Sequence, residues 1–270
     1  MTQKLILVGC GNMGYAMLSG WLSSGSLAIS EVVVVEPNDT LRARAEKLGC
    51  VALQNASALN SAIPEVVVLA VKPQVLEDAL AGYRRWGNGP TTFVSIAAGK
   101  PIATFSGILG ENTPVMRCMP NTPAAIGKGM MVTFANRYVT PAAAAFIADL
   151  LASSGEVASI PSEDLMDAVT AVSGSGPAYI FHFIECLTAA AEAVGLPGKT
   201  AKMLAMQTVY GAASLARESG EEPGELRRQV TSPNGTTAAA LSVLMEGDRL
   251  KTLLTEAVIA ARDRGIELGK

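Results

Sequence analysis

Short apolar runs alternate with helical stretches over the first part of the chain. Leu5–Val8 is continuously apolar, as is typical of a strand buried on both faces, and Val32–Val35, Val66–Val71 and Thr92–Ile96 repeat this pattern. Further strands are expected at Pro114–Cys118, Met130–Phe134 and Glu156–Ile160, with helices at Met13–Ser23, Thr40–Leu48, Gln74–Tyr83 and Pro141–Leu151. This alternation predicts a mostly parallel sheet with crossover helices.

From about Pro161 the strand-like runs disappear. The remaining chain is rich in Ala, Leu and Glu, and its apolar residues follow helical spacing. The expected helices are Leu165–Val172, Ala178–Val194, Lys199–Glu218, Pro223–Thr231, Thr236–Met245 and Arg249–Leu268. We therefore expect an α/β domain over residues 1–160 and an all-α domain over residues 161–270.

Composition and charge exclude several classes of protein. Hydrophobic residues make up 49% of the 270 residues and charged residues 17%, so the chain is neither disordered nor fibrous. A net charge of −3 argues against nucleic-acid binding, and no apolar run approaches the ~20 residues that span a bilayer. Because no apolar signal-peptide region precedes the first strand, we expect a cytoplasmic protein.

Cysteine and histidine chemistry is scarce in this sequence. The four cysteines are scattered without a CxxC pair, and we expect reduced, mostly buried thiols. The single histidine, His182, excludes a multi-histidine metal site, so no metal is expected. His182 falls within a predicted helix, where we expect it to be packed rather than catalytic.

A glycine-rich segment follows the first strand and opens the first helix. In Gly9-Cys10-Gly11-Asn12-Met13-Gly14, the first glycine permits a tight turn, the second lets the backbone approach a pyrophosphate, and the third allows close helix–strand packing. The helix N-terminus then offers free N–H groups to the phosphates. The segment predicts a Rossmann-type dinucleotide site.

Glu36, at the end of the second strand, bears on the choice of dinucleotide. An acidic side chain there typically bonds the ribose 2′-hydroxyl of NAD and repels the 2′-phosphate of NADP. Asn38, Arg42 and Arg44 are close enough in sequence to offset that repulsion, although the simpler interpretation of both arginines is a solvated helix face. The residues thus leave NADH and NADPH open.

Restricted loops follow three more strands at the edge where parallel sheets bind ligands. Ala70-Val71-Lys72-Pro73 places a lysine where it can meet a phosphate or the nicotinamide amide, with an ordinary surface lysine as the alternative. The small residues of Ala97-Ala98-Gly99 allow a flat ring near the backbone, and Arg117–Pro123 forms a proline-locked loop.

Two segments of the second half also carry ligand-binding features. Ser173-Gly174-Ser175-Gly176-Pro177 opens a long helix, where small residues allow close backbone approach or simple helix packing. Ser232–Thr237 lies just before another helix, and a small polar turn there can bind a carboxylate through backbone N–H groups, or act only as a helix cap.

Taken together, these motifs resemble the pyrroline-5-carboxylate reductase family. The matching segments run in order over nearly the whole chain: Gly9–Gly14, Ala70–Pro73, Ser95–Gly99, Met119–Pro123, Asp167–Tyr179, Glu222–Leu226 and Ser232–Thr237. The glycine motif is generic, whereas the serine–glycine–proline block and the Ser232–Thr237 segment are specific.

The resemblance implies NAD(P)H-dependent reduction of (S)-1-pyrroline-5-carboxylate to L-proline, the last step of proline biosynthesis. It implies a Rossmann domain followed by a helical domain that interlocks with a second subunit, such dimers often assembling into decamers. The implied cofactor contacts are Gly9, Cys10, Gly11, Asn12, Met13, Gly14, Asn55, Ala70, Val71, Lys72, Ala97, Ala98 and Gly99. From their positions after the strands, Glu36, Asn38 and Pro73 are expected to contact the cofactor as well. The implied substrate contacts lie in the Ser232–Thr237 loop, at Ser232, Asn234, Gly235, Thr236 and Thr237, with Thr237 nearest the ring nitrogen. Ser175, in the small-residue segment that opens the long helix, is expected to contact the substrate as well.

The chain departs from the family pattern at two positions. The family loop more often reads Ser-Pro-Gly-Gly, whereas this chain carries Asn234, a residue type that tolerates positive φ. Several relatives have a small polar residue near the position of Glu36, so the resemblance slightly favours NADPH while Glu36 favours NADH. An imine is easily protonated, so the reaction needs no histidine acid.

Two other functions fit parts of the sequence. A β-hydroxyacid dehydrogenase shares the two-domain layout but requires a catalytic lysine after the glycine-rich helix start, where this chain has Pro177-Ala-Tyr-Ile-Phe-His-Phe183. A non-catalytic dinucleotide-binding regulator would need no substrate loop.

Overall fold

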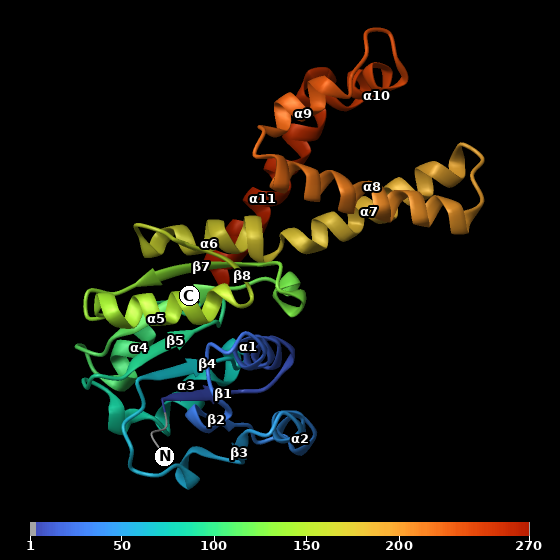
Figure 1. Cartoon of the computed structure of the whole chain (residues 1–270). Helices are drawn as coiled ribbons and strands as arrows, with labels where there is room; N and C mark the ends of the chain where they lie inside the picture. Colours follow the sequence, from blue (N-terminus) through green and yellow to red (C-terminus); the bar gives the residue numbers. More distant parts are fainter. Residues whose placement is uncertain (1–3, 270) are drawn as a thin grey trace. The chain divides into compact units, whose positions relative to one another are not determined.

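The structure is a computed structural model that describes residues 4–269 (Figure 1). Its sheet has eight strands in the order β3-β2-β1-β4-β5-β6-β7-β8. The strands are β1 (Leu5–Val8), β2 (Val32–Val35), β3 (Val51–Leu53), β4 (Val66–Leu69), β5 (Thr92–Ser95), β6 (Val115–Met119), β7 (Gly129–Ala135) and β8 (Gly155–Ser159). The expected mostly parallel sheet is confirmed.

Only the β6–β7 pair is antiparallel in this sheet. The segment between these two strands contains only the short helix η5 (Thr122–Ile126), which is too brief for a crossover, so the chain turns back on itself. The strands that lie parallel beside β1 and β4 are each reached through a stretch of chain longer than the one between β6 and β7.

Helices cover both faces of the sheet. They are α1 (Asn12–Ser23), α2 (Asp39–Lys47), α3 (Leu76–Ala81), α4 (Ile102–Leu109) and α5 (Pro141–Ala152). Leu5 and Leu7 pack with residues of α1 and α5, whereas Ile6 and Val8 pack with residues of α3 and α4. Both faces of the central strand are therefore buried, which explains its unbroken apolar run.

Two elements were not expected from the sequence. Strand β3 is a three-residue edge strand with an exposed Val51, so it carries little of the apolar pattern of a buried strand. Helix α4 is short and contains a glycine, which weakens its helical signal.

The helices of the second half agree closely with the expected ones. They are α6 (Met166–Val169), α7 (Gly176–Ala193), α8 (Gly198–Ser219), α9 (Pro223–Gln229), α10 (Thr236–Met245) and α11 (Arg249–Leu268). The expected helix Leu165–Val172 is different in detail, because it passes from α6 into a wider π-helical turn, η7 (Thr170–Gly174). None of the described helices is long and apolar enough to span a membrane.

Contacts within the chain group it into two compact units. The first contains the residues up to Ser175 and those from Ala261 onward, and the second is Gly176–Ala260. The division by contacts thus comes later than the change of sequence character near residue 160, because η7 contacts Met119 of β6 and Asn121 just after that strand. The last turns of α11 also belong to the first unit, where the chain at Leu268 lies beside Gly99.

Candidate active site

The glycine loop between β1 and α1 assigns a distinct role to each glycine. Gly9 has a φ of +92°, and a Cβ there would lie 2.6 Å from the carbonyl oxygen of Ala70. A Cβ on Gly14 would lie 2.3 Å from the carbonyl oxygen of Gly9, so any side chain would push α1 off the loop. A Cβ on Gly11 would meet nothing within 4 Å, which leaves its backbone open to a ligand.

Glu36 fastens this loop to the end of β2. Its side chain is buried, one carboxylate oxygen accepts the N–H of Cys10 at 2.7 Å, and the other accepts the N–H of Asn38 at 2.9 Å. Charge-assisted bonds of this kind hold a buried carboxylate firmly. Glu36 therefore organises the glycine loop as well as presenting negative charge beside it.

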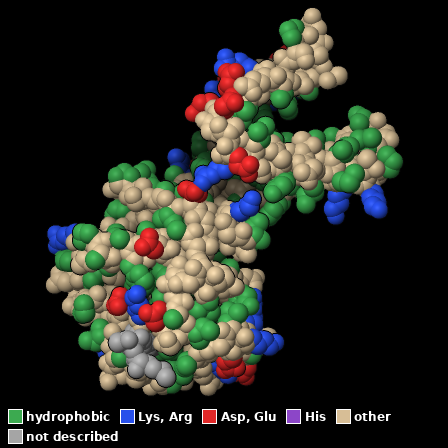
Figure 2. All heavy atoms as spheres, viewed as in Figure 1, with side chains coloured by type: hydrophobic (Ala, Val, Ile, Leu, Met, Phe, Trp, Pro, Cys, Tyr) green, Lys and Arg blue, Asp and Glu red, His purple; other side chains and the backbone are tan. Residues whose placement is uncertain are grey.

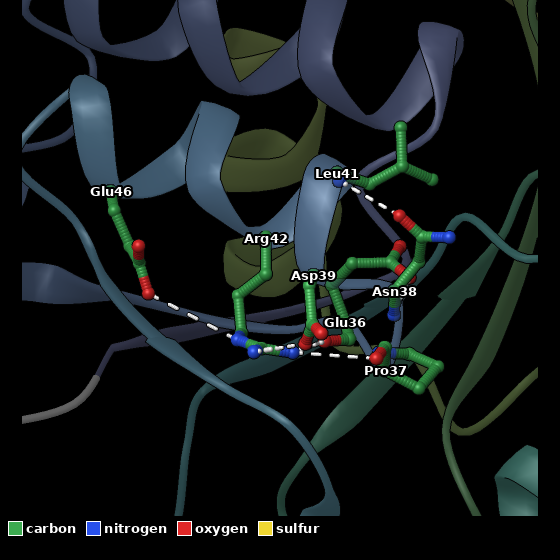
Figure 3. Close-up of polar contacts among 7 residues, drawn as sticks. All are labelled: Glu36, Pro37, Asn38, Asp39, Leu41, Arg42 and Glu46. Atoms are coloured by element: carbon green, nitrogen blue, oxygen red, sulfur yellow. Dashed lines mark hydrogen bonds and ion pairs between the residues drawn. The ribbon is translucent and has the colours of Figure 1, made fainter.

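The arginine nearest to Glu36 is already engaged. Figure 3 shows Arg42 bonding the backbone carbonyls of Glu36 and Pro37, at 3.1 and 3.3 Å, and the carboxylate of Asp39 at 2.5 Å. Arg42 is thus neither the freely solvated side chain nor the free cation that the sequence suggested. Its positive charge is directed at Asp39 and at the carbonyl end of β2.

Arg44 is held elsewhere. Its guanidinium stacks 4.0 Å over the ring of Tyr15, and one nitrogen lies 3.5 Å from the side-chain oxygen of Asn12. The contact with Asn12 places Arg44 beside the first residue of α1.

A cavity of about 630 Å³ opens beside the glycine loop, within the usual size range of ligand sites. Seven of the expected cofactor residues line it: Gly9, Gly11, Glu36, Asn55, Ala70, Val71 and Lys72. Residues that the sequence did not indicate complete a largely apolar wall: Pro37, Leu41, Gln54, Val75, Ala79 and Tyr83. The wall residues come from the connections that follow β2, β3 and β4, so no local motif predicts them.

Tyr83 contributes an unpaired polar group to this wall. Its hydroxyl is buried and has no hydrogen-bond partner within residues 4–269. Burial raises the pKa of this hydroxyl, which keeps it protonated.

The remaining cofactor candidates lie close to this region without lining the cavity: Cys10, Asn12, Met13, Gly14, Asn38, Pro73, Ala97, Ala98 and Gly99. Asn38 caps α2 by accepting the N–H of Leu41, and Pro73 begins the short helix η3 (Pro73–Val75). Ala97 to Gly99 follow β5, and Gly99 adopts a φ of +68°. All lie at or after the carboxyl ends of the strands, where open α/β sheets bind ligands.

The thiol of Cys10, in the glycine loop, is held in its protonated form. Burial is the main cause that raises the pKa of the Cys10 thiol to about 11, and the neighbouring Glu36 adds to this effect. Cys50 and Cys118 are also buried, and Cys186 is exposed, so the expected mostly buried free thiols are confirmed. The described residues contain no cluster of His, Cys, Asp and Glu that could hold a metal ion.

The expected substrate residues fall into two places. Ser175 ends the π-helical turn of the first unit, where its N–H donates to the carbonyl of Thr170 at 2.8 Å. The others lie in the helical unit, between α9 and the first turn of α10: Ser232, Asn234, Gly235, Thr236 and Thr237.

The Ser232–Thr237 loop forms a tight turn before α10. The N–H of Gly235 donates to the carbonyl of Ser232 at 3.1 Å, and Asn234 adopts a φ of +57°. The prediction that Asn234 supports the turn in place of glycine is confirmed. Thr236 and Thr237 start the helix, so their N–H groups belong to the four that an α-helix leaves unpaired.

His182 is not packed, contrary to expectation. It lies in α7, its side chain is 75% exposed, and its ring contacts Glu185 and Cys186. Within a single chain α7 buries none of its residues, so nothing in residues 4–269 covers His182.

Two family models match the chain. One is described as pyrroline-5-carboxylate reductase dimerisation and matches residues 163–268. The other is described as NADP oxidoreductase, coenzyme F420-dependent, and matches residues 4–99.

Several proteins of similar sequence and structure share one name. Pyrroline-5-carboxylate reductase of Pseudomonas aeruginosa is 38% identical over 269 residues, covering 100% of this chain and 98% of that protein. The Synechocystis enzyme of the same name is 39% identical, with 100% of both covered. A solved pyrroline-5-carboxylate reductase from Coxiella burnetii superposes with a TM-score of 0.92 at 34% identity, with 100% of both chains covered. The Plasmodium falciparum enzyme, solved with NADP bound, has a TM-score of 0.83 at 28% identity, with 99% of this chain and 98% of that chain covered.

Proposed function

The chain belongs to the pyrroline-5-carboxylate reductase family, and we propose from that premise how its own residues serve the reaction. The enzyme is an NAD(P)H-dependent oxidoreductase that reduces (S)-1-pyrroline-5-carboxylate to L-proline. A bound nicotinamide supplies a hydride to the carbon of the ring C=N bond. The protein's task is to bind, orient and polarise the imino acid, and a proton reaches the ring nitrogen.

The cavity beside the glycine loop is our proposed dinucleotide site, within a domain over residues 1–160. The observation that carries this assignment is the contrast between the three glycines, since Gly9 and Gly14 are enclosed and Gly11 is open. The free N–H groups at the start of α1 provide donors for the pyrophosphate. The apolar wall that includes Val75 and Ala79 suits a flat base.

Glu36 leads us to propose a preference for NADH over NADPH. Its buried carboxylate places negative charge at the end of β2, where a 2′-phosphate would be repelled. Arg42, the nearest candidate to offset that charge, is bound to Asp39 and to the carbonyls of Glu36 and Pro37. A ribose 2′-hydroxyl can instead donate to a free lone pair of the carboxylate.

The substrate carboxylate is proposed to bind the N–H groups of residues 235–237. The start of α10 carries unpaired N–H groups and the positive end of the helix dipole, which together favour an anion. The Thr237 hydroxyl is proposed to hydrogen-bond the ring nitrogen. Ser175 is proposed to contact the substrate as well.

The helical region over residues 161–270 is proposed to interlock with the same region of a second copy. The family model for this region describes dimerisation, which supports a homo-oligomer. We extend this to an interlocked dimer that can assemble into a decamer, in the cytoplasm.

The test follows absorbance at 340 nm with purified protein, pyrroline-5-carboxylate, and NADH or NADPH in parallel. We expect oxidation of the dinucleotide that depends on the imino acid, with the larger kcat/KM for NADH. Glu36→Gln should lower activity with both dinucleotides, because an amide has a single oxygen and so loses one of the two bonds that the carboxylate accepts from Cys10 and Asn38.

The outcomes separate the parts of the proposal. Turnover with a larger kcat/KM for NADPH would remove the role of Glu36 in selectivity and leave the reaction intact. Binding of a dinucleotide without turnover would contradict the reductase function and favour a regulator.

A further inference from the structure

Asn121 joins two parts of the first unit that lie far apart in the sequence. It follows β6 and its side-chain nitrogen donates to the backbone carbonyl of Ser173 at 3.1 Å, across 52 positions of the chain. Its side-chain oxygen accepts the N–H of Met130 at 2.8 Å. The two bonds fix the orientation of the amide, since an N–H only donates and a carbonyl only accepts.

The chemistry of the acceptor explains why an amide is needed there. In an α-helix the carbonyl of Ser173 would accept the N–H of residue 177, but residue 177 is a proline and has no N–H. The side-chain N–H of Asn121 takes that place. A partly buried carbonyl without a donor would cost free energy, so this bond has a structural purpose.

The backbone around Ser173 is itself unusual. Residues 170–174 form a π-helical turn, closed by the N–H of Ser175 on the carbonyl of Thr170 at 2.8 Å. Single π turns are rare and frequently mark functional sites. The hydroxyl of Ser173 bonds the carbonyl of Val169, so the turn is also supported from within.

A second contact comes from the same end of β6. A Cβ on Gly174 would lie 2.5 Å from the terminal methyl carbon of Met119, so the Met119 side chain lies directly against the glycine backbone. Met119 and Asn121 therefore hold consecutive residues of the π turn, one by packing and one by a hydrogen bond. Both come from the carboxyl edge of the sheet, where the dinucleotide loop also lies.

We propose that Asn121 is a positioning residue that holds the π turn, and so Ser175, in register with the carboxyl edge of the sheet. It acts through Ser173 and Ser175 and need not touch the imino acid. This inference deepens the proposed function, on which its effect on substrate rests, because Ser175 is a proposed substrate contact.

Asn136 offers a matched control at the opposite end of the same strand pair. Its side chain also bridges backbone groups: the oxygen accepts the N–H of Val115 at 3.2 Å, and the nitrogen donates to the carbonyl of Thr113 at 2.9 Å. It is partly buried like Asn121, but it lies after β7 and beside the start of β6. A merely structural role predicts the same behaviour for both asparagines.

The variants are Asn121→Ala, which removes both bonds, and Asn121→Asp, which keeps the acceptor for Met130 but turns an oxygen toward the Ser173 carbonyl. For each we would measure steady-state kinetics, the dinucleotide Kd by fluorescence, and amide hydrogen exchange. Asn136→Ala is measured in parallel. The exchange readout does not depend on turnover.

We expect both Asn121 variants to lower kcat/KM for pyrroline-5-carboxylate about 10-fold and to speed exchange of the Ser175 amide about 10-fold, because both lose the hydrogen bond to the Ser173 carbonyl. The dinucleotide Kd should change less than about twofold. Asn136→Ala should lower the Tm by about as much as the Asn121 variants do. Its kcat/KM and Ser175 exchange should stay within about twofold of the unmodified enzyme.

Unchanged Ser175 exchange in both Asn121 variants would overturn the positioning role. Equal losses of kcat/KM in the Asn121 and Asn136 variants would mean that Asn121 contributes only to general stability. If the unmodified enzyme does not reduce the imino acid, the proposed function fails, while exchange at Ser175 still decides whether Asn121 holds the turn.

Discussion

Asn234 occupies a position of positive φ, which glycine adopts more readily than other residues. Its φ of +57° lies in the left-handed region, which Asn enters at lower cost than other side-chain-bearing residues. The turn before α10 thereby keeps the shape that exposes the N–H groups of its first residues. The asparagine is a substitute for glycine rather than an obstacle to the loop.

Replacing Asn234 with alanine should cost about 1 kcal/mol of unfolding free energy and lower kcat/KM, because alanine lacks the asparagine's local polar compensation at positive φ. Replacing it with glycine should leave both values unchanged or slightly improved. Urea unfolding and steady-state kinetics measure the two effects. A glycine variant as impaired as the alanine variant would instead assign a direct role to the Asn234 side chain.

Thr237 provides the second prediction at this scale. Thr237→Val should lower kcat/KM for pyrroline-5-carboxylate by at least ~10-fold, from the loss of one hydrogen bond of ~1.5 kcal/mol. Thr231→Val is the control, since its hydroxyl bonds the backbone carbonyl of Arg227 before the substrate loop begins. An unchanged rate in Thr237→Val would remove this hydroxyl from the mechanism.

At the scale of the elements, one ion pair connects a strand and two helices of the first unit. Arg117 of β6 lies 2.8 Å from Glu163, which belongs to the short helix η6 (Glu163–Leu165). The same carboxylate oxygen accepts the N–H of Ile102, the first residue of α4. Arg117 is mostly buried, so the carboxylate compensates a charge that water cannot reach.

Glu163→Ala should therefore destabilise the protein by about 2 kcal/mol, because it leaves a buried guanidinium and a helix N–H without their partner. The comparison is Glu77→Ala, which removes an equally short but exposed pair with Lys100 and should cost less than about 1 kcal/mol. Chemical denaturation measures both. Similar losses in the two variants would mean that burial of Arg117 does not determine the energy.

At the scale of the whole molecule, the decisive feature is that the helical unit buries few of its residues within one chain. Helices α7, α9 and α10 contain no buried residue, and α8 contains only Ala201 and Ala205. Hydrophobic side chains gather over α7 and α8 in Figure 2. Apolar faces of this extent mark an interface, in agreement with the dimerisation model that matches this region.

Phe181→Asp should dissociate the oligomer, because Phe181 is 60% exposed on α7 in the single chain and a carboxylate cannot be buried there without a partner. Ile63→Asp is the control, since Ile63 is 61% exposed but lies in the first unit, before β4. Light scattering during gel filtration gives the mass of each variant. A Phe181 variant of unchanged mass would place the interface elsewhere.

The sequence predicted the regular elements well where the pattern is local. The strand Leu5–Val8, the glycine loop and the helices Thr236–Met245 and Arg249–Leu268 follow from periodicity and turn chemistry within a few residues. Strand β3 and helix α4 were not predicted. A partly exposed edge strand and a short helix with a glycine both leave weak periodic signals.

By itself the sequence determined the glycine loop and the family, because glycine spacing and whole motifs are properties of contiguous residues. The tertiary structure alone decided that the Glu36 carboxylate bonds Cys10, that Arg42 is already engaged, and that Asn121 takes the place of the N–H that Pro177 lacks. Each of these depends on a bond between residues brought together by packing of the chain. The exposure of His182 has the same cause, since burial depends on what covers a helix and not on the helix itself.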